Sequence, residues 1–314
     1  MPEKIAIIGA GLVGSAWAIV FARAGHEVAL YDDTEGQCAA ALARIETNLE
    51  ALEGHGLIDD PAAARARIAT AAGLADALDG AAYAQESVFE RADVKRAVYA
   101  EIDGVAGPDL VVGSSSSGIP CSTFTEGLGI GPRCLIAHPI NPPYVIPLVE
   151  MVPAPWTEEA TVSRCWTLME AAGMKPVRLT REIDGFIANR LQAALLWEAF
   201  RLLEGGYATA EDIDTTISAG LGRRWAFIGP FETIDLNAPG GLADFCARLG
   251  DGFFEFVRQG EPAAPLSDAV VGEAHEQRRA RLPMATHGER QAWRDRRLMG
   301  LAAHLRDARR DSGD

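Results

Sequence analysis

The hydrophobic pattern at the N-terminus changes from strand-like to helical within a few residues. Lys4–Gly9 is a short run rich in β-branched residues, and Leu12–Ala24 carries apolar residues at helical spacing. Gly25 and His26 interrupt this pattern, and Glu27–Tyr31 is a second strand-like run. This order predicts a β-α-β unit at the start of the chain.

Strand-like and helical segments continue to alternate as far as residue 179. Residues 35–55 and 60–72 are alanine-rich, and we expect them to form a helical hairpin inserted after the second strand. Further helices are expected over Ala92–Ile102 and Thr157–Ala172. The remaining strands are expected at Tyr83–Val88, Leu110–Gly113, Arg133–His138, Leu148–Val152 and Pro176–Leu179. Such alternation is typical of a parallel sheet flanked by helices.

The pattern becomes almost entirely helical after Asp184, with Phe186–Glu204 and Ala210–Ala219 as the clearest segments. A length of 314 residues suggests two domains. We therefore predict an α/β protein with a Rossmann-type dinucleotide-binding domain over residues 1–183, which includes the hairpin insertion. An all-helical C-terminal domain is predicted over residues 184–314.

Composition excludes several classes of protein. With 48 % apolar residues the chain is suited to a globular core, and its 29 basic against 44 acidic residues give a net charge of −15, which disfavours nucleic-acid binding. An arginine-rich stretch at 278–310 is interpreted as a solvated helix face. Three glycines break the uncharged run Ile5–Ala22, and no later stretch is long enough for a bilayer, so we expect a soluble chain with no membrane partner.

The five cysteines are widely spaced and form no CxxC motif. This pattern fits reduced thiols in a cytoplasmic protein better than a disulfide framework or a zinc site, and no metal is expected.

The first strand leads into the segment Gly9-Ala10-Gly11-Leu12-Val13-Gly14, a GxGxxG motif between a strand and a helix. Its first glycine permits a tight turn, its second lets a pyrophosphate approach the backbone, and its third lets the helix pack closely on the strand. The first amides of the helix, at Leu12 and Val13, would donate to the anion. The motif predicts a dinucleotide site; the alternative is that the glycines serve only to reverse the chain.

An acidic residue ends the second strand, 18 residues beyond Gly14. This residue, Asp32, would bind the adenosine ribose hydroxyls, and together with Asp33 it would repel a 2′-phosphate. We therefore predict NAD rather than NADP. FAD stays open, because flavoproteins use the same opening motif.

A carboxylate lies inside the apolar strand Leu148–Val152, where its charge requires a partner. This residue is Glu150, and His138 ends the preceding predicted strand. The proline-rich connection could fold one strand back on the other, so that imidazole and carboxylate meet as a general base with a fixed tautomer. From spacing alone, a core histidine beside an unrelated carboxylate is equally consistent.

Two further segments carry polar groups suited to a ligand. Ser114–Gly118 follows a strand, where hydroxyl groups reach the carboxyl edge of the sheet, although a flexible turn is an alternative. Asp184–Arg190 opens the helical domain and presents Asn189 early in the first helix, where helix capping is the alternative.

The chain resembles the 3-hydroxyacyl-CoA dehydrogenase superfamily, most closely its lambda-crystallin and L-gulonate 3-dehydrogenase branch. The resemblance is carried by the segments GAGLVGSAWA, SSSSG, HPINPPYVIPLVEMV, DGFIANRLQ and GLGRRWAFIGPFETIDLN, and it covers residues 4–240 and extends toward residue 300. It implies a catalytic dyad of His138 and Glu150, with Ser117, Asn141 and Asn189 around the substrate oxygen.

The same resemblance implies that Glu90 and Lys95 accompany Asp32 at NAD. From the residues alone, Glu90 would be a helix N-terminal charge and Lys95 part of a solvated face.

The charge of the predicted hairpin bears on the substrate. CoA-specific members of the superfamily carry basic residues there, whereas residues 33–75 of this chain hold three arginines against seven acidic residues. Arg223 and Arg224 could bind a small carboxylate, although surface arginines are the alternative. We therefore predict NAD-dependent oxidation of a small 3-hydroxy acid such as L-gulonate.

Three alternatives to L-gulonate oxidation stay open. Trp225 and Phe227 could bind the cation of L-carnitine, and 3-hydroxybutyryl-CoA could bind through residues not identified. A crystallin-like structural protein that binds NAD without turnover is the non-enzymatic alternative. The apolar helices after residue 190 predict a homodimer through the helical domain.

Overall fold

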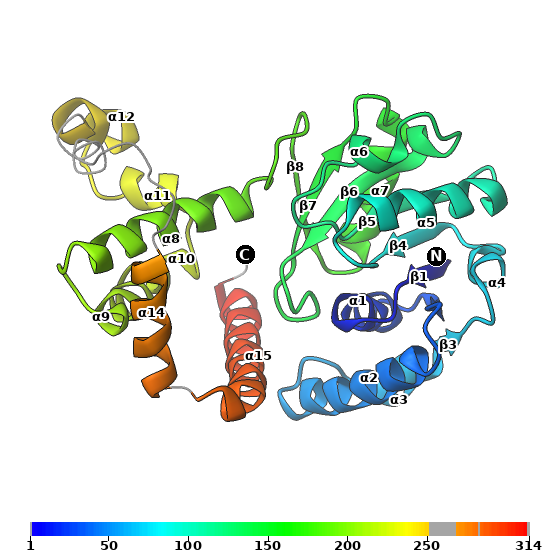
Figure 1. Cartoon of the computed structure of the whole chain (residues 1–314), viewed down its shortest axis with the longest axis horizontal. Helices are drawn as coiled ribbons and strands as arrows, with labels where there is room; N and C mark the ends of the chain where they lie inside the picture. Colours follow the sequence, from blue (N-terminus) through cyan, green and yellow to red (C-terminus); the bar gives the residue numbers. More distant parts are fainter. Residues whose placement is uncertain (1, 251–267, 282, 313–314) are drawn as a thin grey trace. The chain divides into compact units, whose positions relative to one another are not determined.

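The computed structural model describes residues 2–250, 268–281 and 283–312. The chain groups into two compact units (Figure 1). The first unit contains Met1–Arg190 and Gln291–Asp314, and the second contains Leu191–Arg290.

The described residues of the first unit form an eight-stranded sheet with the order β3-β2-β1-β4-β5-β6-β7-β8. All neighbouring strands are parallel except β6 and β7, which are antiparallel. The strands are β1 (Lys4–Ile8), β2 (Glu27–Tyr31), β3 (Ile68–Thr70), β4 (Tyr83–Glu86), β5 (Val111–Ser114), β6 (Cys134–Pro139), β7 (Leu148–Pro153) and β8 (Lys175–Arg178).

Helices cover both faces of the sheet. Successive residues of a strand point to opposite sides, and apolar side chains on both sides are buried under helices. Ile5 and Ile7 of β1 belong to one apolar core, with residues from α1, α2, α7 and α15, and Ile8 belongs to a second core, with residues from α4, α5 and α6. The helices are α1 (Leu12–Arg23), α2 (Gln37–Gly54), α3 (Pro61–Ala66), α4 (Leu74–Leu78), α5 (Ala92–Val105), α6 (Ser122–Thr125), α7 (Glu159–Ala171) and α15 (His287–Ser312), with a 3-10 turn at Gly131–Arg133.

One expected helix contains a strand. Residues 60–72 were expected to be helical throughout, but α3 ends at Ala66 and β3 follows at Ile68–Thr70. Asp60 caps α3 by accepting from the Ala63 amide at 2.8 Å. The next residues pair with β2, with Val28 opposite Ile68, so sheet hydrogen bonds override the local helical preference of an alanine-rich segment.

In the described part of the second unit all regular secondary structure is helical, as the sequence predicts. It contains most of α8 (Ala188–Glu204), followed by α9 (Ala210–Thr215), a π-helical turn at Thr216–Leu221, α10 (Gly222–Trp225), α11 (Pro230–Asp235), α12 (Gly241–Phe245), a second π-helical turn at Cys246–Gly250, α14 (Asp268–Arg281) and a 3-10 turn at Met284–Thr286. Thr209 and Asp212 form a capping box at the start of α9.

The C-terminal helix differs from the expected domain limits, which assigned all of residues 184–314 to the helical domain. Residues from Gln291 onward group with the first unit. Met299 is buried in the core that contains α1, and the Arg306 guanidinium donates to the Gly56 carbonyl.

All five cysteines lie in the described part of the chain and are free thiols. Within the same residues, no helix combines the length and the apolar character needed to cross a bilayer.

Candidate active site

The carboxyl ends of β1, β4, β5 and β6 meet at one edge of the sheet, because these four strands are parallel. The segments that follow them therefore lie next to one another. They contain the glycine-rich turn, the segment with Glu90, the serine-rich turn and the connection after His138.

The glycine-rich turn admits only glycine at two of its positions. Gly9 has a φ of +98°, and a Cβ atom there would lie 2.6 Å from the Ser87 carbonyl oxygen. A Cβ on Gly14 would lie 1.8 Å from the Gly9 carbonyl oxygen, so α1 packs directly on the turn. Both constraints are those that the sequence motif predicts.

The backbone of this turn is open where the motif predicts that a dinucleotide pyrophosphate approaches. A Cβ on Gly11 would have no neighbouring atom within 4 Å, so the backbone is open to a ligand there. α1 begins at Leu12, whose side chain is 78 % exposed, and its first turn contains no acidic residue that would repel an anion. The amides of Leu12 and Val13 belong to this first helical turn, which lacks intrahelical partners for its N–H groups.

Two charged side chains flank the glycine-rich turn. Asp32 accepts hydrogen bonds from the Ala10 amide at 2.7 Å and from the Thr34 amide at 2.9 Å, which fixes its carboxylate where a ribose contact is predicted. Arg44 of α2 donates to the Ala10 carbonyl at 2.7 Å and to the Ser15 hydroxyl at 3.2 Å. In the sequence Arg44 is one of the three arginines of the hairpin segment, and nothing in the local pattern indicates the direction of its side chain.

His138 and Glu150 are direct partners across the antiparallel strands β6 and β7. The imidazole Nδ1 lies 2.8 Å from Glu150 Oε2, and both side chains are buried. Because a carboxylate accepts, Nδ1 donates, and the neutral ring then carries its free lone pair on Nε2. The proline-rich connection does fold the second strand back, as proposed from the sequence.

The other oxygen of Glu150 contacts the beginning of α8. Oε1 accepts from the backbone amides of Ile187 at 2.8 Å and Ala188 at 3.0 Å. Burial alone would raise the pKa of Glu150, but the hydrogen bonds from His138 and from these two amides outweigh it and lower the pKa. Glu150 is therefore an ionised partner that holds the ring of His138 in one orientation.

The turn before α8 shapes the wall beside the imidazole. Phe186 is fully buried with a φ of +50°, which is uncommon for a residue other than glycine, and Gly185 before it has a φ of +73°. The Phe186 ring centroid lies 5.6 Å from that of His138. The left-handed turn thus places an aromatic ring and two amide donors around the dyad.

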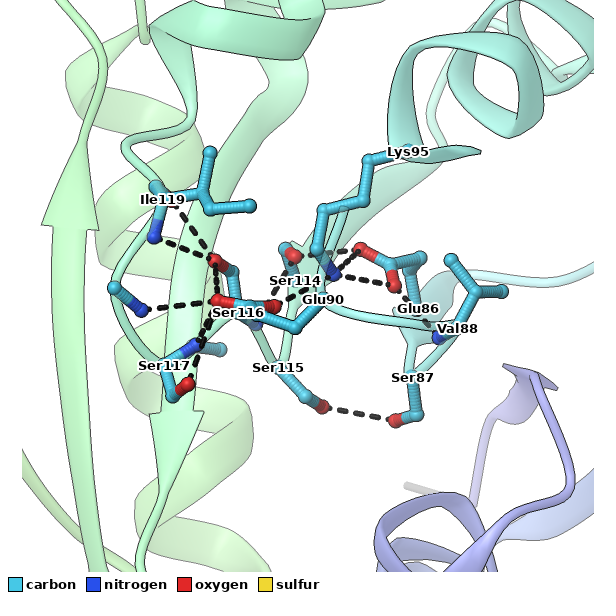
Figure 2. Close-up of polar contacts among 12 residues, drawn as sticks. Glu86, Ser87, Val88, Glu90, Lys95, Ser114, Ser115, Ser116, Ser117 and Ile119 are labelled. Atoms are coloured by element: carbon cyan, nitrogen blue, oxygen red, sulfur yellow. Dashed lines mark hydrogen bonds and ion pairs between the residues drawn. The ribbon is translucent and has the colours of Figure 1, made fainter. Parts of the chain in front are cut away.

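The serine-rich turn after β5 is organised by Glu90 (Figure 2). Glu90 Oε1 accepts from the Ser116 hydroxyl at 2.7 Å, the Ser117 amide at 2.8 Å and the Gly118 amide at 3.0 Å. Burial raises the pKa of Glu90, but the hydrogen bond from Ser116, the charge of Lys95 and these two amides have a larger opposite effect and lower it. Ser117 itself is exposed, and its hydroxyl donates to the same Glu90 oxygen at 3.4 Å.

Lys95 does not lie on a solvated face, the reading that its sequence position alone suggests. The side chain is 1 % exposed, and Nζ lies 2.9 Å from Glu86 and 3.3 Å from Glu90. Glu86 was missed from the sequence. The signal that indicated Glu150, a carboxylate inside a buried strand, is also present in Tyr83–Val88.

Asn189 joins these groups to the beginning of α8. It follows Ala188, which contacts Glu150, and its Nδ2 donates to the Ser117 carbonyl. The structure therefore connects His138, Glu150, Asn189, Ser117 and Glu90 through a continuous series of contacts.

The other predicted site residues are placed less specifically. Asn141 is exposed in the connection between β6 and β7, where its bond to Pro142 is cis. Arg223 and Arg224 belong to the second unit and are exposed on α10, so their role in substrate binding stays a prediction. Among the residues that the structure describes, no cluster of histidine, cysteine or acidic side chains could hold a metal ion.

An imidazole held by a carboxylate, at the sheet edge that carries a dinucleotide turn, is suited to removing a hydroxyl proton while hydride leaves the same carbon. Fold and site together define a dinucleotide-dependent dehydrogenase. The chain belongs to the 3-hydroxyacyl-CoA dehydrogenase family: the model of the NAD binding domain matches residues 4–183, and the model of the C-terminal domain matches residues 185–278.

Relatives with known names cover nearly the whole chain. A lambda-crystallin homolog from Bos taurus is 42 % identical over 306 residues, which are 96 % of this chain and 95 % of that protein. An L-carnitine dehydrogenase from Pseudomonas aeruginosa is 35 % identical over 315 residues, which are 99 % of this chain and 96 % of that protein.

Solved structures agree with this assignment. An NAD⁺-dependent dismutase, 5-formyl-3-hydroxy-2-methylpyridine 4-carboxylic acid 5-dehydrogenase, superposes with a TM-score of 0.80 at 28 % identity over 98 % of each chain. A 3-hydroxybutyryl-CoA dehydrogenase from Escherichia coli gives 0.68 at 27 % identity over 87 % of this chain and 57 % of that one. The chain is an NAD-dependent hydroxy-acid dehydrogenase, and the predicted cofactor NAD is confirmed.

Proposed function

We propose that the chain oxidises the 3-hydroxyl of a small hydroxy acid such as L-gulonate, with His138 and Glu150 as its catalytic dyad. The observation that carries the proposal is the 2.8 Å hydrogen bond between these two buried side chains. Glu150 is held in addition by the amides of Ile187, just before α8, and of Ala188, its first residue, so the pair is fixed before a substrate arrives.

The chemistry follows from the state of these groups. His138 Nε2 takes the proton of the substrate hydroxyl, and Glu150 stabilises the imidazolium that forms. NAD, held at the glycine-rich turn and at Asp32, would supply the nicotinamide acceptor for the hydride that leaves the same carbon. Ser117 and Asn189, joined by the hydrogen bond from the Asn189 side chain to the Ser117 carbonyl, orient the substrate oxygen.

The charge around the hairpin supports a small substrate rather than a CoA ester. Each arginine of residues 33–75 is already engaged: Arg44 with the glycine-rich turn, Arg65 with Glu46 at 2.8 Å, and Arg67 with the Ala22 carbonyl at 3.3 Å. The seven acidic residues of the same segment leave an unfavourable field for the phosphates of CoA.

L-carnitine is a second candidate. A relative 35 % identical to this chain is named as an L-carnitine dehydrogenase, and Trp225 and Phe227 of the second unit are exposed aromatic rings. Such rings suit a quaternary ammonium group. Arg223 and Arg224 are exposed on α10, the helix that ends at Trp225. Their guanidinium groups suit the carboxylate that both candidate substrates carry.

A panel of substrates tests the proposal. Formation of NADH is measured with L-gulonate, L-carnitine and 3-hydroxybutyryl-CoA at saturating NAD, and kcat/KM is compared. We expect L-gulonate to exceed the other two by at least about tenfold. A preference for L-carnitine would transfer the assignment to the second candidate, and a preference for the CoA ester would overturn the argument from hairpin charge. No turnover of any of the three would contradict the proposed substrate class.

A further inference from the structure

Glu86 is a fully buried carboxylate that takes no part in the proton transfer proposed above. It ends β4, and its oxygens accept from the Ser114 hydroxyl at 2.5 Å, the Val88 amide at 2.8 Å and Lys95 Nζ at 2.9 Å (Figure 2). Three donors satisfy the carboxylate, so its burial is tolerated. Hydrogen bonding alone does not account for a carboxylate at this buried end of β4.

Lys95 connects Glu86 with the edge of the site. Its ammonium is almost wholly buried and lies between two carboxylates, 2.9 Å from Glu86 and 3.3 Å from Glu90. Glu90 is the outer member, with a side chain 39 % exposed. A buried ammonium requires a buried counter-charge, and Glu86 supplies it. Glu86 thereby keeps a cation in place behind Glu90.

Glu90 contacts both Lys95 and the serine-rich turn, so the position of the Lys95 ammonium affects the turn. While Oε2 faces Lys95, Oε1 accepts from Ser116, Ser117 and Gly118. The Ser117 carbonyl in turn accepts from Asn189. A single series of polar contacts therefore runs from the buried end of β4 to the two residues expected to meet the substrate oxygen.

We propose that Glu86 is a positioning residue: through Lys95 it holds Glu90 in the orientation that fixes the turn 116–118 at the cofactor and substrate site. The proposal rests on the proposed function only for the roles of Ser117 and Asn189 toward substrate. The competing account is that Glu86 merely neutralises Lys95 and stabilises the fold.

A double-mutant cycle distinguishes these accounts. The binding constant of NADH is measured by fluorescence titration for the wild-type chain, E86Q, E90Q and E86Q/E90Q. If Glu86 acts through Glu90, E86Q weakens NADH binding about tenfold in the wild-type background and less than twofold when Glu90 is already replaced. Equal weakening in both backgrounds, or none in either, would overturn the proposal.

Amide hydrogen exchange supplies a local readout. We expect a peptide that contains Ser117 and Gly118 to exchange at least about tenfold faster in E86Q than in the wild type, because Glu90 no longer holds those amides. E159Q is the matched control, since it removes an exposed carboxylate that pairs with Arg178 at 2.6 Å, outside this network. Unchanged exchange in E86Q would contradict the proposal.

If E86Q does not fold, E86Q/K95M removes both buried charges together and restores a neutral interior. We expect this variant to fold but to keep the weakened NADH binding and the faster exchange at residues 117 and 118. Wild-type affinity in the folded double variant would show that the network serves stability alone. Because NADH binding needs no substrate, these results stand whether or not L-gulonate is oxidised.

Discussion

Glu150 uses its two oxygens for different partners, Oε2 for His138 and Oε1 for the amides that begin α8. The E150Q variant keeps the shape and one acceptor oxygen but loses the charge that stabilises an imidazolium. We expect kcat to fall by about 10²-fold, within the range of general-base assistance, while KM for NAD changes less than threefold. Steady-state kinetics check this, with E159Q as a control for a Glu→Gln change elsewhere. An E150Q variant that retains half of the wild-type kcat would contradict it.

The same contacts predict a response of stability to acid. Glu150 and Glu90 both have a folded-state pKa below the ordinary value of 4.5. Below about pH 4.5 the unfolded chain therefore binds more protons than the folded chain, and acid favours unfolding. The contribution of these two carboxylates to the free energy of unfolding is complete above that pH. It is lost as the pH falls through their folded-state pKa values. Urea unfolding at several pH values should show a smaller acid loss in E150Q than in the wild type; equal losses would refute the assignment.

For single residues, the sequence predicts a role in the site where the residues next to them in the chain determine their surroundings. Glu150 is recognisable because apolar residues flank it, and the glycines because their spacing has a steric meaning. Lys95 and Arg44 are not, since the directions of these two helical side chains depend on Glu86 at the end of β4 and on Ala10 in the glycine-rich turn. Glu86 was within reach of the same argument as Glu150.

The junction of β1 and α1 gives a prediction at the scale of an element. G14A would place a Cβ 1.8 Å from the Gly9 carbonyl oxygen, so α1 must move, and we expect a loss of about 2 kcal/mol or more in the free energy of unfolding. In G11A the added atom meets open space, so stability should change by less than about 1 kcal/mol.

NADH titration separates the two variants further. The motif predicts that a pyrophosphate approaches the backbone at Gly11, so G11A should bind NADH at least about tenfold more weakly despite its intact fold. Thermal or urea unfolding without cofactor measures the first effect, and fluorescence titration measures the second. Wild-type NADH affinity in G11A would contradict the placement of the cofactor at this turn.

Elements with a strong internal pattern were predictable, and short ones were not. The first β-α-β unit appears as expected because its periodicity and its glycines agree. β3 has three residues, and only its pairing with β2 makes it a strand. The start of α8 illustrates the same limit: the sequence places Asn189 early in a helix, but the contacts of the Ile187 and Ala188 amides with Glu150 depend on β7, which lies 37 and 38 residues earlier in the chain.

For the whole molecule, we predict a homodimer through the second unit. α8 exposes the apolar side chains of Leu191, Leu195 and Leu196, with Leu191 60 % exposed. Covering such a surface is favourable in water. Light scattering should give twice the chain mass of 33.5 kDa, and L195D/L196D should reduce it to the mass of one chain. A wild-type monomer at micromolar concentration would rule out this assembly.

The division of the chain shows what the pattern along a sequence cannot supply. The change to helical texture after Asp184 marks where a second unit begins, and the family models change between residues 183 and 185. That texture does not indicate that the last helix returns to the first unit, because a helical residue such as Met299 packs on whichever core it reaches.

The most direct test of the account is the H138Q variant, measured for turnover of the best substrate and for NADH binding. Glutamine can replace the hydrogen bond to Glu150 but cannot take the hydroxyl proton. We predict that kcat falls by about 10²–10⁴-fold while the NADH dissociation constant stays within threefold of the wild type. A variant that turns over at the wild-type rate would contradict the account.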